Sequence, residues 1–420
     1  MVAPRRRRQP DTVGVATLDV AHSHRRSAVV LGPINLPPLD ELTTRFVSMA
    51  AVGPVTRVGL QPSTTSTRWR FSPHGIDRAV STTIRAEASD PVTLLTTLRQ
   101  SPGDGIRVLT AGDYLAIDFS HGLGEVPLLD ILVAVLFGSV APSDPAVWAP
   151  YQHPLPPLLT ATLRAIGLGP QRLWPLWRQH RRNVGTAPAG PAVASRSDIP
   201  PGAATSVAQI PAATVAELRR RRDSTLPGVS MFAIYTHALH EAFADVGFDV
   251  DPTVTVPFDV RPYLPSGHST LATFSAGLEF TLDHHRGARG LHADMAAANR
   301  MARPVANLVA STLKARAAMR AGHRTEWQVP PRPRLRLLHS NIGDVPRTGW
   351  SFSDPAEARI LVASDPAGPS GMTVTTSSAM GALWLTAAFH DSVFDAQRVS
   401  AALDSVAERV VSLTSARRGR

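Results

Sequence analysis

The sequence predicts an α/β protein that consists of two blocks of similar size. Short apolar runs typical of strands alternate with helical runs along the chain. The chain has 420 residues, of which 43% are hydrophobic, and this is enough for two domains with buried cores. A stretch rich in Pro, Gly and Ala divides the chain near its middle. We therefore expect a flexible N-terminal arm over residues 1–26, a first block over 27–177, a linker over 178–205 and a second block over 206–420.

The first block begins with an apolar run and ends near the most apolar segment of the chain. Its expected elements are, in chain order, the apolar run Ala28–Leu31, a helix over Asp40–Ala51, strands over Thr67–Phe71 and Ser81–Ala86, a helix over Val92–Arg99, and strands over Ile106–Leu109 and Tyr114–Phe119. The turn Ala111-Gly112-Asp113 predicts that the last two strands form a hairpin. Residues Val126–Val140 include Asp130 and fall short of the roughly 20 apolar residues of a transmembrane helix. They therefore predict a buried core helix.

The second block alternates helices and strands in the same way. Its expected elements are helices over Ala212–Arg222 and Ser230–Val246, strands over Thr253–Val260 and Ala276–Leu282, a helix over Ala293–Met319, and a final helix over Ala396–Leu413. A basic, Pro-rich stretch over Val329–Arg336 and several short strands precede the final helix. No internal repeat of short period is visible.

The composition excludes several classes of chemistry. Cysteine is absent, which excludes disulfides, zinc sites with Cys ligands and thiol catalysis. The start, MVAPRRRRQP, lacks the apolar stretch of a secretory signal, so we expect a cytoplasmic protein without a transmembrane segment. The net charge is +10, but Lys314 is the only lysine, and a GC-rich coding sequence explains this skew more simply than nucleic-acid binding. We therefore expect no nucleic-acid partner. We expect the positive net charge to attract phosphorylated cofactors or acidic carrier proteins.

One segment, DYLAIDFSHGLGEVPLLDILVAVLF (residues 113–137), combines a strand, a turn and a helix. Strand periodicity places His121 on the same face as Phe119, where the strand ends. Gly122 and Gly124 then permit a sharp turn. An imidazole held in this way can act as a general base at neutral pH. On the local pattern alone, a structural histidine in the core is the simpler interpretation. A metal pair of His121 and Glu125 lacks a third ligand, so we expect no metal.

Four segments resemble, in the same order, the motifs of the condensation-domain superfamily. SHGLGEV (residues 120–126) is similar to its HHxxxDG motif, and VPFDVRPYLPSGHST (256–270) to its PVDLRP stretch. HSNIGDVP (339–346) resembles its SNxG segment, and LWLTAAFHDSVFDAQRV (383–399) its closing strand and helix. This superfamily includes nonribosomal peptide condensation domains, chloramphenicol acetyltransferase, polyketide-associated acyltransferases and wax ester synthases.

The resemblance implies a fold and an activity. The implied fold is two chloramphenicol acetyltransferase-like subdomains, each a mixed sheet with flanking helices, that form a V with a central tunnel. The implied activity moves an acyl group from a CoA or phosphopantetheine carrier-protein thioester to the hydroxyl or amine of a small molecule, in secondary or lipid metabolism. No permanently bound cofactor is expected.

The resemblance also implies roles for particular residues. His121 matches the second histidine of the motif, which is the expected general base. Glu125 stands in place of the motif's acid, and we expect it to hold the catalytic loop by pairing with Arg261. Ser340 and Asn341 are candidate oxyanion or substrate contacts.

The sequence departs from the motif at three positions. Ser120 replaces the first histidine and remains a candidate substrate contact, Glu125 is one methylene longer than Asp, and Val126 replaces a glycine and narrows the space near His121. Two alternatives therefore stay open. One is a condensation-like cyclase or other non-transfer enzyme that uses the same tunnel, and the other is a non-catalytic binding module with the same fold.

Other catalytic signatures are weak or absent. HHRGARG (residues 284–290) fits HHxxxDG only with Arg289 in place of the acid, and we expect it to be a surface loop. The chain contains no GxSxG, HExxH or GxxxxGK[ST] sequence, so hydrolase, zinc-protease and P-loop functions have no support.

Overall fold

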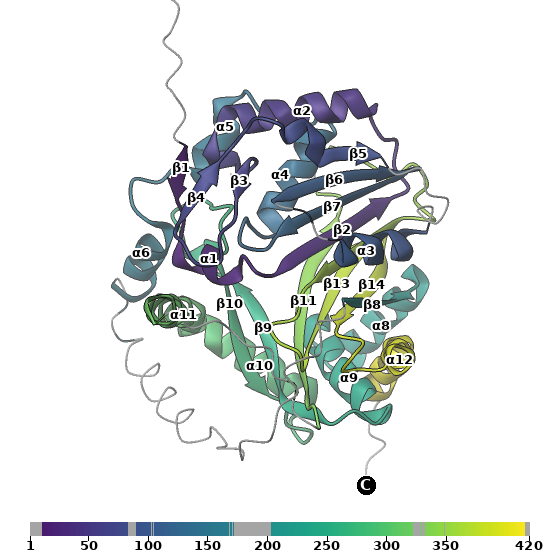
Figure 1. Ribbon diagram of the computed structural model, residues 1–420. Coiled ribbons are helices and arrows are strands. Elements are labelled where there is room, and N and C mark those ends of the chain that lie inside the picture. Colours follow the sequence, from purple (N-terminus) through teal and green to yellow (C-terminus); the bar gives the residue numbers. More distant parts are fainter. Residues whose placement is uncertain are drawn as a thin grey trace, which may run out of the picture.

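The computed structural model describes residues 11–82, 90–101, 103, 105–167, 169, 171, 203–321, 329, 332–347 and 349–415. Within these residues the strands form two large sheets of five and six strands and a small sheet of three strands. Figure 1 shows the five-stranded sheet above the six-stranded sheet, with helices flanking both. We call the parts built on these two sheets the N-terminal half and the C-terminal half.

The sheet of the N-terminal half has the order β12-β2-β7-β6-β5. Its strands are β2 (Arg26–Gly32), β5 (Val80–Thr82), β6 (Ile106–Ala111), β7 (Tyr114–Ser120) and β12 (Arg359–Ser364). The pair β5 and β6 is parallel and the other neighbours are antiparallel, so the sheet is mixed. The flanking helices are α2 (Leu39–Val52), α3 (Pro91–Gln100) and α4 (Val126–Leu136). The predicted hairpin and core helix are confirmed, because Ala111 pairs with Tyr114 and α4 contributes to the same core as β2 and β7.

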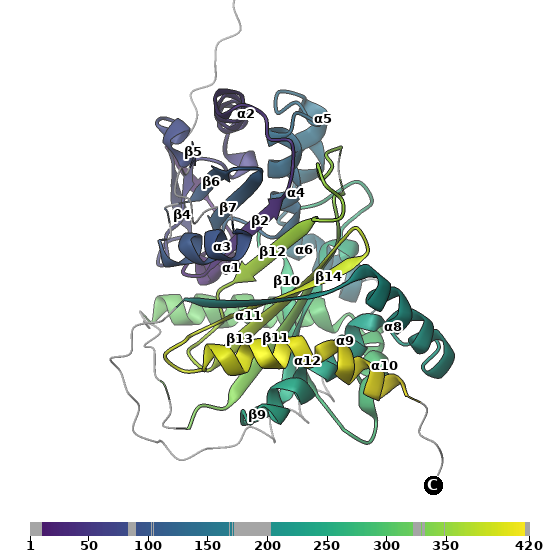
Figure 2. The same cartoon turned by 90° about the vertical axis from the view of Figure 1, so that its right-hand side faces the viewer.

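The sheet of the C-terminal half has the order β10-β9-β11-β13-β14-β8. Its strands are β8 (Ala204–Ile210), β9 (Val250–Asp259), β10 (Ser275–Thr281), β11 (Leu335–Val345), β13 (Gly371–Ala379) and β14 (Ala382–Phe389). Its helices are α8 (Ala212–Thr225), α9 (Met231–Asp245), α10 (Gly287–Arg300), α11 (Arg303–Arg320) and α12 (Ala396–Thr414). Side-chain caps begin two of them: Ser230 accepts a bond from the amide of Ala233 at α9, and Asp395 from that of Arg398 at α12. Figure 2 shows α8, α9 and α12 together on one face of this sheet.

The shorter elements complete the described chain. They are β1 (Thr12–Gly14), α1 (Thr17–His22), β3 (Leu60–Gln61), β4 (Arg68–Phe71), α5 (Pro145–Trp148), α6 (Pro157–Thr162) and the single turns η1 (Pro54–Thr56), η2 (Ile76–Ala79), η4 (Ala149–Tyr151), η5 (Leu163–Gly167) and η7 (Arg261–Tyr263). None of the helices in the described residues is long and apolar enough to cross a bilayer.

The expected flexible arm over residues 1–26 is wrong from Asp11 onward. Residues 12–22 form β1 and α1, and residues 1–10 lie outside the described residues. The cause is Asp19, which is fully buried and pairs with Arg57 at 2.9 Å while accepting a hydrogen bond from the backbone amide of Thr273 at 3.1 Å. This carboxylate ties the start of the chain to both halves.

The expected second block over 206–420 is also not a separate unit. Strand β12 leaves the C-terminal half and pairs antiparallel with β2, from Arg359 opposite Gly32 to Ser364 opposite Ser27 (Figure 2). The pairing satisfies the free edge of β2, whose residues are almost all buried and whose backbone groups need partners. The expected linker over 178–205 lies outside the described residues up to 202, and its last two residues already belong to β8.

The expected helix over Ala293–Met319 is two helices. α10 ends at Arg300 and α11 begins at Arg303, because Pro304 cannot donate a helical hydrogen bond and Ala302 adopts a left-handed conformation with φ of 54°. The strand expected over Ser81–Ala86 is described only as far as Thr82.

The turn between β13 and β14 is strained at one residue. Met380 and Gly381 are the two central residues, with φ of 49° and 84°, which is the type I′ geometry that prefers Asn-Gly. Met380 is 53% exposed, so little packing is lost on substitution. We expect Met380→Asn to stabilise the fold by about 1 kcal/mol, or about 1 °C in Tm for a chain of this length.

Thermal unfolding measures this effect, with Met380→Ala as the control. Alanine keeps the left-handed strain and should give no comparable gain. Equal Tm values for the two variants would contradict the explanation.

Candidate active site

His121 stands where β7 gives way to the turn before α4. The turn is tight: a Cβ atom at Gly122 would collide with the carbonyl oxygen of Asp19, and one at Gly124 with that of Leu271. The backbone of His121 is held on both sides, since its amide donates to Arg25 at 2.7 Å and its carbonyl accepts from the Thr273 hydroxyl at 3.1 Å. The position of this histidine is therefore set by close backbone packing.

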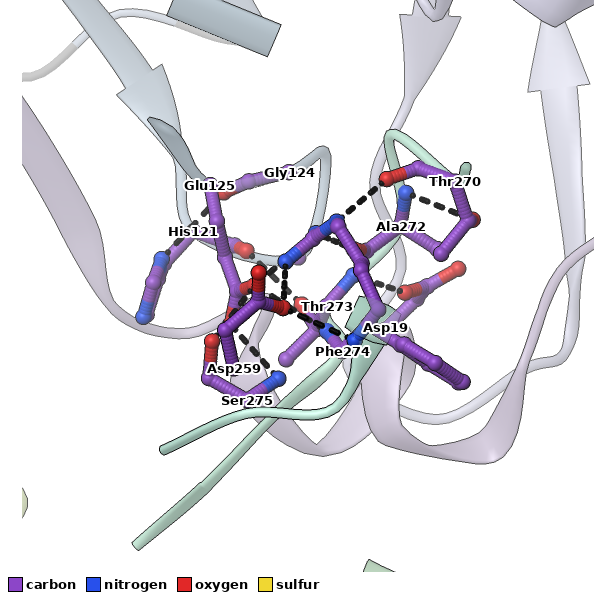
Figure 3. Close-up of polar contacts among 12 residues, drawn as sticks. Asp19, His121, Gly124, Glu125, Asp259, Thr270, Ala272, Thr273, Phe274 and Ser275 are labelled. Carbon is purple, nitrogen blue, oxygen red and sulfur yellow. Dashed lines mark hydrogen bonds and ion pairs between the residues drawn. The ribbon is translucent and has the colours of Figure 1, made fainter. Parts of the chain in front are cut away.

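The imidazole of His121 has one nitrogen engaged and one free. Nδ1 lies 3.3 Å from the carbonyl oxygen of Gly124, and because a carbonyl only accepts, this contact assigns the proton to Nδ1 (Figure 3). Within the described residues no hydrogen bond engages Nε2. Burial, and then the positive charge of Arg25, lower the pKa of His121 to about 4. The ring is therefore neutral at physiological pH, with the lone pair of Nε2 available.

A cavity of about 190 Å³ lies against this ring at the junction of the two halves. Residues of β7 and α4 line it from the N-terminal half, and residues of β10, β11 and β13 line it from the C-terminal half. Val126 is part of the lining and does not separate His121 from the cavity. The resemblance implies a central tunnel between the two halves, and this cavity lies at the junction where that tunnel is expected.

The structure brings Glu125 and Arg261 together. Nη2 of Arg261 donates to Oε2 of Glu125 at 3.0 Å, and both side chains are about nine-tenths buried. The carboxylate also accepts from the backbone amides of Phe274 and Ser275 at 3.1 and 3.2 Å, and from the Ser275 hydroxyl at 2.9 Å (Figure 3). These four bonds come from the C-terminal half, while Glu125 itself begins α4 in the N-terminal half.

Arg261 is equally well satisfied. Its Nε donates to the carbonyl of Thr270 and its Nη2 to that of Ala272, both at 2.8 Å, and its Nη1 pairs with Asp259 at 2.8 Å. A buried ion pair is stable only when the remaining donors and acceptors have partners. Here they do, so the pair holds the loop of His121 firmly against β10.

The structure separates the other predicted contacts. Ser340 lines the cavity of His121, but Asn341 does not, because successive residues of a strand face opposite sides. Asn341 is exposed, and its side-chain oxygen accepts from the amide of Gly343 at 3.0 Å. Ser120 is 2% exposed and donates to the carbonyl of Ser23 at 2.9 Å. The structure therefore places neither Asn341 nor Ser120 at the cavity of His121.

Two residues of this site, His22 and Arg25, were not predicted from the sequence. Both line the cavity, and the ring of His22 meets that of His121 edge-to-face at 5.6 Å between centroids. Burial, and then His121 and Arg25, hold the pKa of His22 well below its ordinary value. The run HSHRR over residues 22–26 was the available signal, but it lies in the segment expected to be a flexible arm.

Comparison with known proteins finds similar folds among solved structures. No protein-family model and no curated protein matches the sequence. A trichothecene 15-O-acetyltransferase from Fusarium sporotrichioides superposes with a TM-score of 0.65 at 10% identity, over 96% of this chain and 95% of that one. The condensation domain of the monacolin K polyketide synthase gives 0.59 at 12% identity, over 96% and 97%.

A third similar structure is polyketide synthase associated protein 5 from Mycobacterium tuberculosis. It has a TM-score of 0.55 at 15% identity, over 97% of this chain and 98% of that one. Together with the two mixed sheets and their flanking helices, these likenesses show that the chain shares the fold of a condensation domain, an acetyltransferase and a polyketide synthase associated protein.

The ion pair of Glu125 and Arg261 should contribute strongly to the free energy of unfolding. In Glu125→Gln, the guanidinium of Arg261 loses its buried countercharge and keeps only the exposed Asp259, and breaking a buried pair typically costs about 3–5 kcal/mol. Asp259→Asn is the matched control, because it removes the exposed partner of the same arginine and should cost no more than about 1 kcal/mol. Urea unfolding of the two variants measures the difference. Equal losses would contradict a special role for the buried partner.

Proposed function

We propose that the protein is an acyltransferase that moves an acyl group from a CoA or carrier-protein thioester to a hydroxyl or amine, with His121 as general base. One observation carries the proposal: a neutral imidazole, fixed through Nδ1, presents a free Nε2 to a cavity between the two halves. The fold shared with an acetyltransferase and with condensation domains supports the same reaction class.

In the proposed reaction the acceptor and the thioester meet in this cavity. The hydroxyl or amine attacks the thioester carbonyl, and Nε2 of His121 takes the proton of the attacking group. The tetrahedral intermediate carries a negative charge on its oxygen. It collapses by breaking the carbon–sulfur bond, and the departing thiolate takes the proton from His121. The products are the ester or amide and the free thiol, and the base is regenerated.

Arg25 and Ser340 are the groups that we propose to face the developing oxyanion. Both line the cavity beside His121, and the charge of Arg25 is close enough to lower the pKa of that ring. A positive charge and a hydroxyl donor in a site that excludes water favour the transition state over the neutral thioester. The carboxylate of Glu125 acts in the opposite sense on His121 and stabilises the imidazolium that forms.

The size of the cavity bears on the substrates. About 190 Å³ is smaller than the roughly 300–1,000 Å³ of most small-molecule pockets. We propose that the reacting ends of donor and acceptor meet inside it while the rest of each molecule stays outside. A role in secondary or lipid metabolism, a cytoplasmic location, the lack of a permanent cofactor and the lack of a nucleic-acid partner remain predictions from the sequence.

Replacing the base tests the reaction directly. We expect His121→Ala to lower the rate of acyl transfer at least about 100-fold, the typical contribution of a general base. Release of free thiol from short and long acyl-CoA donors, with product mass as a second readout, measures the rate. Asn341→Ala is the control, because that side chain lies outside the cavity, and it should keep the wild-type rate. If His121→Ala keeps more than about a tenth of the activity, the proposed role is wrong.

The pH profile tests the environment of the base. With a pKa of about 4, His121 stays unprotonated as the pH falls from 8 to about 5.5, so kcat/KM should stay level on this acidic side. An ordinary histidine, with a pKa near 6.5, would lose about tenfold in kcat/KM between pH 8 and 5.5. Arg25→Gln removes a charge that lowers the pKa and should move the acidic limb to higher pH. A wild-type limb near pH 6.5 would contradict the assignment.

A further inference from the structure

A second group of chemically active side chains lies in the C-terminal half, outside the cavity of His121. We call it the His237 cluster, and its members are His237, Glu241 and His284. His237 and Glu241 belong to α9, and His284 lies in the connection between β10 and α10. Figure 1 shows α9 and α10 at the end of the C-terminal half that is remote from the N-terminal half. None of the described residues lining the cavity belongs to this cluster.

The three side chains converge. His237 and Glu241 are one helical turn apart, and Nδ1 of the histidine lies 3.3 Å from Oε1 of the glutamate. The ring of His284 stands edge-to-face against that of His237, with 5.9 Å between centroids. One potential ligand atom of each residue lies within 4.8 Å of those of the other two.

The strongest sign of a ligand is the state of His237. Its side chain is almost completely buried, yet within the described residues neither Nδ1 nor Nε2 has a hydrogen-bond partner. The approach to Glu241 at 3.3 Å lacks the direction of a hydrogen bond. Buried polar groups without partners are rare in folded proteins and point to a missing ion or water. A simple ion pair with Glu241 would still leave Nε2 unsatisfied.

The neighbouring groups are suited to a cation. Glu241 supplies a carboxylate oxygen 3.3 Å from the unpartnered Nδ1 of His237. His240, one residue before Glu241, has its ring 6.1 Å from that of His284, and its buried Nδ1 also lacks a partner in the described residues. Its Nε2 lies 3.1 Å from the carbonyl oxygen of Asp251, which orients the ring.

We propose that His237, Glu241 and His284 bind one divalent transition-metal ion of the zinc class. Two imidazoles and one carboxylate are a known zinc ligand set, whereas Mg²⁺ and Ca²⁺ prefer oxygen ligands. Ligand atoms of a tetrahedral site with bonds near 2.0 Å stand about 3.3 Å apart. His237 and Glu241 already have this separation, and His284 is exposed and free to turn inward. The fourth position is left to water.

Binding at this place would fasten the connection between β10 and α10 to α9. His284 contributes from HHRGARG, the segment that matches the catalytic motif without its acid. His284 is exposed, as expected of a surface loop, and it does not line the cavity of His121. The sequence signal for the cluster was the pair His237 and Glu241 at helical spacing, and the third ligand is 43 positions further along the chain than Glu241.

Calorimetric titration of the untagged, metal-free protein with ZnCl₂ tests the proposal. We expect one Zn²⁺ to bind per chain and to raise Tm, and Co²⁺ to give the visible absorption of a tetrahedral nitrogen and oxygen site. His284→Ala and Glu241→Gln should each weaken Zn²⁺ binding at least tenfold. His285→Ala is the matched control, since it removes the adjacent exposed histidine outside the cluster, and it should bind like the wild type.

Three results would overturn the proposal. The first is no stoichiometric Zn²⁺ binding by the wild type. The second is equal weakening by His284→Ala and His285→Ala, which means an adventitious ion on surface histidines only. The third is unchanged affinity in both His284→Ala and Glu241→Gln. Circular dichroism of the metal-free variants checks that they are folded, and because His284 is exposed its replacement should not disturb the core.

Discussion

The ion pair between Glu125 and Arg261 connects the two halves of the molecule at the place where His121 is held. Both groups are removed from water, which carries a large desolvation cost, and the structure offsets it with a full set of partners. The carboxylate accepts from the amides of Phe274 and Ser275, where β10 begins, and the guanidinium donates to two carbonyls of the preceding loop. The longer side chain of glutamate, compared with the aspartate of the resembling motif, still satisfies these bonds. The loop of His121 is thus oriented from the opposite half.

The same burial that fixes His121 also changes its chemistry. A ring with a pKa of about 4 is always ready to accept a proton at neutral pH, but it is a weaker base than free imidazole. Arg25 increases this effect and Glu125 opposes it. In the proposed reaction, the positive charge of Arg25 that weakens the base also lies beside the developing oxyanion. The site therefore combines a modest base with a polarised environment.

The two halves are interlocked by the chain itself. β12 crosses from the second half to the edge of β2, and Asp19 near the start of the chain accepts from Thr273 in the second half. Arg99 on α3 adds a bond to Thr205 at 2.7 Å and an ion pair with Asp365 at 3.1 Å. Such crossings restrict the movement of one half against the other. The walls of the cavity, which come from both halves, are held in register as a result.

Local sequence patterns determined the elements that depend on local physics. The hairpin of β6 and β7, the apolar helix α4 and the position of His121 on the same strand face as Phe119 followed from periodicity and turn residues. The pairing of Glu125 with Arg261 followed from resemblance to known motifs and not from any spacing in the chain. Pro304 is the local sequence signal that separates α10 from α11, because proline is tolerated at the first turn of a helix but not in its interior.

Tertiary structure decided what depends on contacts between distant segments. Asp19 looks like an ordinary surface residue in a polar terminus, and only its burial against Arg57 and Thr273 makes the segment ordered. Ser340 and Asn341 are neighbours in sequence, yet strand alternation sends only one of them to the cavity. The meeting of His22 and Arg25 with His121, and of His284 with His237, needs chain crossings that no periodicity encodes. Hydrophobic periodicity reports which face of an element is buried, whereas the partner against which it is buried is set by the packing of the whole chain.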